Sequence, residues 1–490
     1  MSDAPAAPAA VAGPDLGVLY DQVRYPTNVV PQATPDRMAV LARAGGRSPA
    51  DVRTARVLEI GCSDGINLLS LAAAAPEAQY LGIDLSGVAI ERGRKWRDAA
   101  GLTSVRLEVM DLVDAVEGLD GPFDYIIAHG VFAWVPQHVR EALFALIGRH
   151  LAPEGVAHVS FNALPGGHFR RIIREILLHE IAPIADPEAR RRQAVAVLKA
   201  LAGAEETDNV FQMAIRKTAS GRSSTLADSL FHDELSPYWE PMSLTDAADL
   251  ARRHGVAFLN DLTPGLMQNG YRRDIEAANE EERERAQLRE LQREDYIAVR
   301  FFRNAIWVRD DGRPRGALDL DVVAGFYASA SGKRIGDGEY ELRDGTFSVD
   351  DDQLKAAMDA LIAAHPARLR VADIAPSPGH VQALFRLFDS EGIGLHTVEA
   401  PFATTLPDRP TASPLSRALI ADGLPAICRL DHHAIAIPDP EPRRLLMLAD
   451  GTRSLDELIG EAAAEGLGTP ETLRPALEAL MQSALMVREI

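Results

Sequence analysis

The sequence predicts an α/β protein: a Rossmann-like domain with a seven-stranded sheet and a helical insertion, followed by two small winged-helix-like α+β modules. Three observations predict this organisation. Apolar, strand-like runs alternate with helical patterns up to about residue 311. A glycine-rich turn joins the first strand to the first helix. After a DGRPR turn at 311–315, short amphipathic helices replace the alternation.

Seven strands are expected in the first domain, which we place at 15–311. A strict alternation of strand and helix requires a parallel sheet covered by helices. The first helix ends at Pro76, because proline cannot continue a helix. The strands are predicted at 57–59, 80–83, 105–110, 125–128, 156–161, 256–259 and 305–308. The helices between them are predicted at 66–75, 88–100, 139–151 and 245–254.

Two helical regions interrupt this pattern. The segment 169–201 lacks strand signals and is rich in helix formers, so we expect a helical insertion at about 167–230. We expect this insertion to cover the side of the ligand site where a second substrate would enter. The stretch 274–295 is highly charged and contains pairs such as Glu281 and Arg285 at i,i+4. We interpret it as a solvated spacer helix.

The 490 residues exceed what one hydrophobic core usually organises, so several domains are expected. A tail at 1–14 precedes the first domain, and the later modules are placed at 312–400 and 401–490. Their elements are expected at 350–364, 371–374, 380–388, 395–398, 443–448 and 473–485, with a further helix whose capping box is Ser454 and Glu457. Neither module contains a dense Lys/Arg recognition helix, so protein contact, including homodimer formation, is favoured over DNA binding. The Pro-rich linker at 401–414 predicts that residues 406–490 have a core of their own and are dispensable for a ligand pocket in the first domain.

The composition excludes or disfavours several classes of function. A balance of 51 basic against 71 acidic residues gives a formal net charge of −20, which disfavours a nucleic-acid substrate. No apolar run approaches the length that spans a bilayer, and the first dozen residues lack the features of an export signal. We therefore expect a cytoplasmic protein with no membrane insertion. Cys62 and Cys428 are too few for a disulfide framework, and His432 and His433 have no further ligands at metal spacing, so no metal site is expected.

The run 57–84, VLEIGCSDGINLLSLAAAAPEAQYLGID, carries the most specific functional signal. Glu59 stands two residues before the turn, where it would repel a pyrophosphate and suit a cationic ligand. Asp84 closes the second strand, where a carboxylate can accept from both hydroxyls of a ribose. S-adenosylmethionine explains both acids. Two alternatives stay open: the GxSxG elbow of a hydrolase, with Ser63 as nucleophile, and an accidental glycine-rich turn.

This loop resembles motif I of the class I S-adenosylmethionine-dependent methyltransferases. The wider chain resembles the bacterial branch that carries a methyltransferase regulatory domain, to which rickettsial protein lysine methyltransferases are similar. Two positions depart from the pattern: Ser63 replaces a usual glycine, and Gly167 stands where this branch has tryptophan after Pro-Gly. The resemblance rests on 20–43, 123–136 (FDYIIAHGVFAWVP), 150–180 and 230–259 (LFHDELSPYWEPMSLTDAADLARRHGVAFL) as well as on the loop.

The resemblance implies S-adenosylmethionine as cofactor and S-adenosylhomocysteine as product. Glu59 is expected to orient the methionine amino group, Asp84 to bind the ribose, and Asp111 to accept from the adenine amine. Tyr20 and Tyr25 resemble positions that fold over the cofactor. The full set of expected cofactor residues is Tyr20, Tyr25, Glu59, Gly61, Cys62, Ser63, Gly65, Asn67, Asp84, Leu85, Asp111, Leu112, His129 and Gly130.

Methyl transfer from a sulfonium needs positioning and desolvation but no covalent enzyme nucleophile. We place Phe132, Trp134, Asn162 and His168 around the acceptor channel, and either His168 or His129 is a candidate to take a proton. The resemblance implies N-methylation of lysine side chains in a protein or peptide substrate, most simply an envelope or surface protein. A small-molecule or peptide natural-product methyltransferase and a non-catalytic adenosylmethionine-binding regulator are the alternatives.

Overall fold

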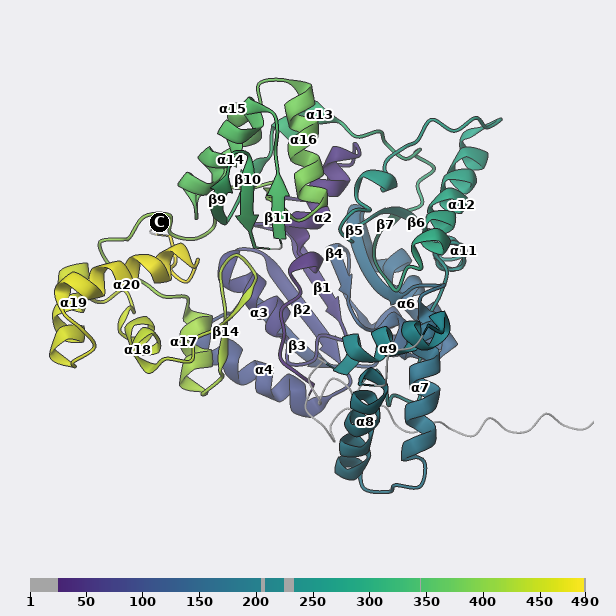
Figure 1. The fold of residues 1–490 in the computed structure, drawn as a ribbon, viewed down its shortest axis with the longest axis horizontal. Coiled ribbons are helices and arrows are strands. Elements are labelled where there is room, and N and C mark those ends of the chain that lie inside the picture. The colour runs from purple at the N-terminus through teal and green to yellow at the C-terminus, as the bar shows by residue number, and fades with distance from the viewer. Residues whose placement is uncertain (1–24, 204–207, 224–232, 344, 489–490) are drawn as a thin grey trace, which may run out of the picture.

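The computed structural model describes residues 25–203, 208–223, 233–343 and 345–488. Its centre is a seven-stranded sheet with the strand order β3-β2-β1-β4-β5-β7-β6 (Figure 1). The strands are β1 (Arg56–Ile60), β2 (Gln79–Asp84), β3 (Val105–Val109), β4 (Phe123–Ala128), β5 (Leu151–Asn162), β6 (Val256–Asp261) and β7 (Phe302–Arg309). β1 to β5 pair in parallel as predicted. β7, however, runs antiparallel to both β5 and β6, which the strand-helix alternation did not predict.

Successive side chains of a strand point to opposite faces, and this period of two divides the apolar core. Val57 of β1 packs into the core on one face of the sheet, and Leu58 packs into the core on the other. Helices α2 (Pro35–Ala44), α3 (Ile66–Ala74) and α4 (Gly87–Ala100) cover the first face. The second face is covered by α5 (Leu112–Gly118), α6 (Gln137–His150), α11 (Leu244–Arg252) and α12 (Glu280–Ala298).

The expected helical insertion is confirmed and has a small core of its own. It contains α7 (Gly167–Ile181), α8 (Pro187–Ala202) and α9 (Val210–Ser223), which form one group at the lower right in Figure 1. Ile173 and Leu177 of α7 pack with Leu198 of α8 and Ala219 of α9. The amphipathic pattern of α7 therefore serves the insertion, while its N-terminus stays next to the end of β5.

Helix α12 is not the solvated spacer that its charge indicated. Leu288 and Leu291 are buried in the core of the second sheet face, and Asp295 is fully buried. The Asp295 carboxylate accepts from Nε and Nη2 of Arg303 on β7, at 2.7 and 2.9 Å. The exposed Glu281–Arg285 pair is present as predicted, so only the outer face of the helix is solvated.

The region after 311 forms further helices and small sheets. The predicted helices are confirmed as α14 (Asp352–Ala364), α15 (Val371–Ile374) and α16 (Pro378–Asp389), preceded by α13 (Leu320–Ala324). Two three-stranded sheets accompany them, most of whose strands the sequence analysis missed. One is β11 (Gly345–Ser348), β10 (Glu339–Leu342) and β9 (Gly332–Gly336); the other is β12 (Leu369–Arg370), β8 (Tyr327–Ser329) and β13 (Gly394–His396).

The C-terminal part contains α17 (Pro414–Ala421), β14 (Ala426–Cys428), β15 (Ala434–Ala436), α18 (Pro440–Leu448), α19 (Leu455–Ala464) and α20 (Pro470–Gln482). The predicted capping box of Ser454 and Glu457 is present at the start of α19. The winged-helix-like description of both modules, and their boundaries, stay predictions. No helix in the described part of the chain combines the length and apolar composition that crossing a membrane requires.

The modules after 311 pack tightly on the central domain. α17 lies beside α4 in Figure 1, and Nε1 of Trp96 on α4 donates to Oδ2 of Asp422 at 2.8 Å. One cluster of buried apolar side chains includes Met38, Val57, Phe385 and Met486, which come from every part of the chain except the insertion. The DGRPR turn is also anchored, because Arg315 is buried and pairs with Glu284 of α12.

Candidate active site

The turn after β1 has the backbone conformation that small residues permit. Gly61 and Gly65 have φ values of 68°, and Ser63 between them has a φ of 52°. This left-handed region is uncommon for a residue with a side chain. A Cβ on Gly61 would lie 2.5 Å from Cγ2 of Val131, so the chain also passes too closely for a larger residue. The turn thus lets α3 begin directly beneath the ends of the parallel strands.

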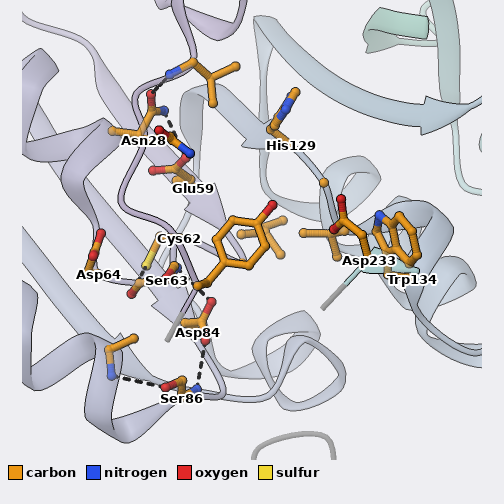
Figure 2. A pocket seen from close by; sticks show the side chains of 18 of the residues that line it. Asn28, Glu59, Cys62, Ser63, Asp64, Asp84, Ser86, His129, Trp134 and Asp233 are labelled. Carbon is orange, nitrogen blue, oxygen red and sulfur yellow. Dashed lines mark hydrogen bonds between the residues drawn. The ribbon is translucent and has the colours of Figure 1, made fainter. Parts of the chain in front are cut away.

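A cavity of about 690 Å³ opens at these strand ends, within the range typical of small-molecule sites. It brings most of the predicted site residues together. Those that line it are Tyr25, Glu59, Gly61, Cys62, Ser63, Asn67, Asp84, Leu85, Asp111, Leu112, His129, Gly130, Trp134 and Asn162. Figure 2 shows Glu59, Asp84 and His129 around the same space although they lie near the ends of three different strands, β1, β2 and β4.

Three predicted residues do not line the cavity, and a fourth cannot be placed among the described residues. Gly65 faces the core, where a Cβ would meet Leu107 at 2.5 Å, so its role is to let α3 pack. Phe132 is buried between Phe144 and Phe161 rather than at the acceptor channel. His168 is exposed in the first turn of α7 and is not among the cavity-lining residues. Tyr20 lies outside the described residues.

Glu59 provides a buried acid next to the turn. Its Oε1 accepts from Nδ2 of Asn67 at 2.9 Å, while Oε2 is buried and has no hydrogen-bond partner among the described residues. Burial raises the pKa of this carboxyl to about 8, and the nearby Asp64 and Asp84 contribute. A buried acceptor without a partner is costly, and a ligand cation would satisfy it. The methionine ammonium group of the expected cofactor fits this position.

Asp84 organises the turn as well as the cavity. Its Oδ2 accepts from the Ser63 backbone N–H and its Oδ1 from the Ser86 backbone N–H, both at 2.8 Å. Each carboxylate oxygen can accept more than one hydrogen bond, so both can still take a ribose hydroxyl. These two hydrogen bonds from backbone N–H groups hold the carboxylate in a fixed orientation, which the sequence analysis did not anticipate.

The residues expected around adenine lie at the outer end of the cavity. Leu112 is buried, Leu85 is half-buried, and both line it. Asp111 is exposed, and its Oδ1 accepts from the Val113 backbone N–H as the N-cap of α5. One oxygen of Asp111 therefore has a structural task, and the other is the one that could accept from the adenine amine.

The segment before α2, where Tyr25 was expected to fold over the cofactor, also makes contacts that sequence reasoning missed. Oγ1 of Thr27 donates to the buried Asp64 at 2.7 Å, and the Val30 backbone N–H donates to Oδ1 of Asn67 at 2.9 Å. Asp64 also pairs with Arg92 of α4 at 3.2 Å. These bonds draw residues 25–32 across the cavity. Asp64 could have been predicted as a site residue from the sequence, because it lies within the glycine-rich turn.

His129 ends β4 and carries a neutral ring. Burial lowers its pKa to about 4, and its Nδ1 has no hydrogen-bond partner in the described part of the chain. The ring stacks on His158 with centroids 5.8 Å apart. A neutral imidazole can accept a hydrogen bond, but a group with so low a pKa is a weak base for an alkylammonium.

The other end of the cavity combines Trp134 with a carboxylate from the segment that follows the helical insertion. Arg170 lies over Trp134, with its guanidinium carbon 4.8 Å from the ring centroid, and pairs with the buried Glu234 at 2.8 Å. Asp233, next to Trp134 in Figure 2, lines the cavity. Burial raises the Asp233 pKa to about 6 against the opposing effect of Arg170. Asp233 was missed, although it belongs to the LFHDEL run on which the resemblance rests.

A second tryptophan, Trp239, contacts two of the residues at this end but is not among the cavity-lining residues. Nε1 of Trp239 donates to Oδ1 of the buried Asn162 at 2.9 Å, so Asn162 orients an aromatic ring. The rings of Trp134 and Trp239 lie 6.3 Å apart, and Arg174 lies over both. Gly167 also lines the cavity.

The geometry gives no support to the hydrolase elbow. A serine nucleophile needs a base within hydrogen-bond reach. Among the described residues, no hydrogen bond joins Oγ of Ser63 to a histidine, and the Ser63 backbone is held by Asp84. Burial raises the pKa of the neighbouring Cys62 thiol well above its usual value, so Cys62 is not an activated nucleophile either.

Comparisons with known proteins agree with a methyltransferase fold. Residues 57–155 match the family "Methyltransferase domain", and residues 227–309 match the "Predicted methyltransferase regulatory domain". The Rickettsia prowazekii protein RP028 is 32% identical over 219 residues, which are 44% of this chain and 87% of RP028. RP789 of the same organism is 29% identical over 63% of this chain, and the chain spans 55% of the length of RP789. The crystallised PKMT2 from Rickettsia typhi in complex with AdoHcy has the same fold, with a TM-score of 0.79 and 20% identity over 95% of this chain and 100% of that one.

Proposed function

Because the chain belongs to the class I S-adenosylmethionine-dependent methyltransferases with a methyltransferase regulatory domain, we propose that it methylates lysine side-chain amines of a protein acceptor. An envelope or surface protein is the acceptor we favour. One observation carries the choice of an amine: the Asp233 carboxyl lies beside Trp134 in the cavity that also contains Glu59 and Asp84.

The cofactor end holds S-adenosylmethionine, whose sulfonium supplies an activated methyl group. Glu59 binds the methionine ammonium, Asp84 binds the ribose, and the turn residues allow close backbone approach. AdoHcy bound to PKMT2 from Rickettsia typhi, a protein of the same fold, supports this use of the cavity. The residues described above account for the methionine ammonium and for the ribose hydroxyls of the ligand.

The acceptor end suits a cation that must become neutral. At neutral pH, removing the proton of a lysine side chain costs roughly 4 to 5 kcal/mol. An Asp233 carboxylate attracts the ammonium as it approaches. The buried Trp134 ring then reduces the exposure of the group to water, and this desolvation favours the neutral amine. With a pKa of about 6, Asp233 is ionised above that pH and is too weak a base to hold the amine proton, so its role is to bind and orient, and the proton passes to bulk water before the methyl group is transferred.

The test uses the purified protein, S-adenosylmethionine with a labelled methyl group, and an envelope protein fraction. We expect methyl-lysine in the labelled protein by mass spectrometry. Asp233→Asn should lower kcat/KM for the acceptor at least about tenfold while the affinity for S-adenosylhomocysteine stays unchanged, because only binding at the acceptor end is lost.

Glu240→Gln is the matched control. Glu240 is an exposed acid of the same region that pairs with Arg171 and is not among the cavity-lining residues, so kcat/KM should stay within about twofold of the unchanged protein. Label in a small molecule or on a carboxylate would contradict the lysine proposal. Equal activity of Asp233→Asn and Glu240→Gln would contradict the role of Asp233.

A further inference from the structure

A turn of the C-terminal module reaches into the central domain beside the cofactor end of the cavity. The turn connects β14 to β15, and His432 within it has a φ of 62°. The His432 backbone N–H donates to the Arg429 carbonyl at 3.1 Å, and the Arg429 N–H donates to the His433 carbonyl at 2.8 Å. The His432 side chain is 6% exposed. The His432 imidazole is therefore buried against α3 of the central domain and not within its own module.

The His432 ring is hydrogen-bonded at both nitrogens to α3. Nε2 lies 2.8 Å from Oδ1 of Asn67, and Nδ1 lies 3.1 Å from Oγ of Ser70. Since an amide oxygen only accepts, Nε2 carries the hydrogen and Nδ1 accepts from the Ser70 hydroxyl. Burial lowers the pKa of His432 to about 3, so the ring is the neutral form that this pattern requires.

Two donors converge on the Asn67 oxygen from distant parts of the chain. The Val30 backbone N–H is the other donor, at 2.9 Å. If the Asn67 amide were reversed, its NH₂ group would face both donors, so the two bonds determine the amide orientation. The correctly placed Nδ2 then donates to Oε1 of Glu59 at 2.9 Å. Glu59 is thereby held with its second oxygen, Oε2, left without a partner among the described residues.

We propose that His432 is a positioning residue for cofactor binding: through Asn67 it orients Glu59 toward the methionine ammonium group. This inference rests on the proposed function, because it assumes that the cavity binds S-adenosylmethionine. It makes the C-terminal module part of the cofactor site, contrary to the expectation that residues 406–490 are dispensable for the pocket.

The surroundings of the turn support a rigid position for His432. Asp431 pairs with Arg429 and with Arg343 from the middle module. These arginines, together with His433, hold the pKa of Asp431 well below its usual range despite burial. Residues of two modules therefore hold the turn in place. The His432 ring beside Asn67 has little conformational freedom as a result.

The experiment measures S-adenosylhomocysteine binding to the full-length protein by calorimetric titration. His432→Ala should weaken the affinity about tenfold, as expected for a buried bond lost next to the ligand-binding acid. His432→Gln retains an N–H donor and should recover most of that loss. In a Glu59→Gln background, His432→Ala should have little further effect, because the acid that it positions is already absent.

Ser416→Ala is the control for simple destabilisation. Ser416 is buried in the same module, and its hydroxyl donates to the Cys428 carbonyl at 2.6 Å, not to a residue of α3. Its removal should lower the melting temperature but leave the affinity unchanged. An affinity of His432→Ala within about twofold of the unchanged protein would overturn the inference, as would an equal loss in Ser416→Ala or an undiminished loss in the Glu59→Gln background. Absence of binding by the unchanged protein would overturn the proposed function itself.

Discussion

At the scale of single residues, Glu59 shows how a binding site stores unfavourable energy. Its carboxyl is buried, receives one hydrogen bond from Asn67, and has a pKa raised to about 8. In the ligand-free protein the group therefore holds a proton at neutral pH that it would release in the unfolded chain. A cationic ligand reverses this preference, because an adjacent positive charge favours the carboxylate. Ligand recognition and stability are thus opposed at this residue.

This opposition predicts a pH-dependent effect of Glu59→Gln on the ligand-free protein. The folded pKa of about 8 lies above the unfolded value of 4.5, so between these values the folded state binds more protons. Stability then falls as pH rises, by up to about 1.4 kcal/mol per pH unit from this group. Glu59→Gln lacks this titration and should be the more stable protein at pH 8, with a difference that shrinks toward pH 5. Urea unfolding at a series of pH values measures it, and a difference that does not change with pH would contradict the explanation.

At the scale of secondary-structure elements, α12 shows how a charge pattern misleads. Counting charges made α12 a solvated helix, yet Asp295 on its inner face is fully buried against Arg303. The apolar positions Leu288 and Leu291 were present in the sequence, but the density of acids and arginines around them concealed one buried face. A helix packs on the core through the few residues of one face, whereas its overall composition averages that face with the exposed ones.

The two kinds of ion pair on α12 predict different costs of mutation. Asp295→Ala removes a buried partner of Arg303, and we expect a loss of about 3 to 5 kcal/mol in the free energy of unfolding. Glu281→Ala removes an exposed i,i+4 partner of Arg285 and should cost about 0.5 kcal/mol or less. Chemical denaturation of the two variants provides the comparison. Similar, small losses would return α12 to the status of a solvated spacer.

At the scale of the whole molecule, the sheet domain and the later modules share contacts that a string of independent domains would lack. The apolar cluster that contains Met38 of α2 also contains Phe385 of α16 and Met486 near the C-terminus. Polar contacts cross the same interface, between Trp96 and Asp422 and between Asn67 and His432. Stability and cofactor binding are therefore expected to depend on the complete chain.

This shared core predicts one cooperative unfolding transition. Differential scanning calorimetry of the full-length protein should show a single endotherm, and saturating S-adenosylhomocysteine should move the whole transition upward, because a ligand that binds only the folded state stabilises whatever unfolds together with its site. Two separate endotherms, of which only one responds to the ligand, would show that the C-terminal module unfolds independently and would argue against its role in the cofactor site.

The sequence by itself determined the features that depend on neighbouring residues. The periodicity of apolar residues predicted most strands and helices of the central domain, and the spacing of Glu59, the turn and Asp84 predicted where the cofactor site lies. The capping box at Ser454 and Glu457 was predictable for the same reason, since both residues belong to one helical turn. Such patterns are local, and the backbone geometry that they require is known in advance.

Only the tertiary structure decided how distant segments complete the site. His432 and Asn67 are 365 positions apart in the sequence, and no local pattern connects them. The antiparallel direction of β7, the burial of Asp295 and the placement of Asp233 beside Trp134 likewise depend on how elements pack. The sequence does not show whether a given side chain faces water or a cavity. Packing determines its burial and its hydrogen-bond partners, and these determine its pKa.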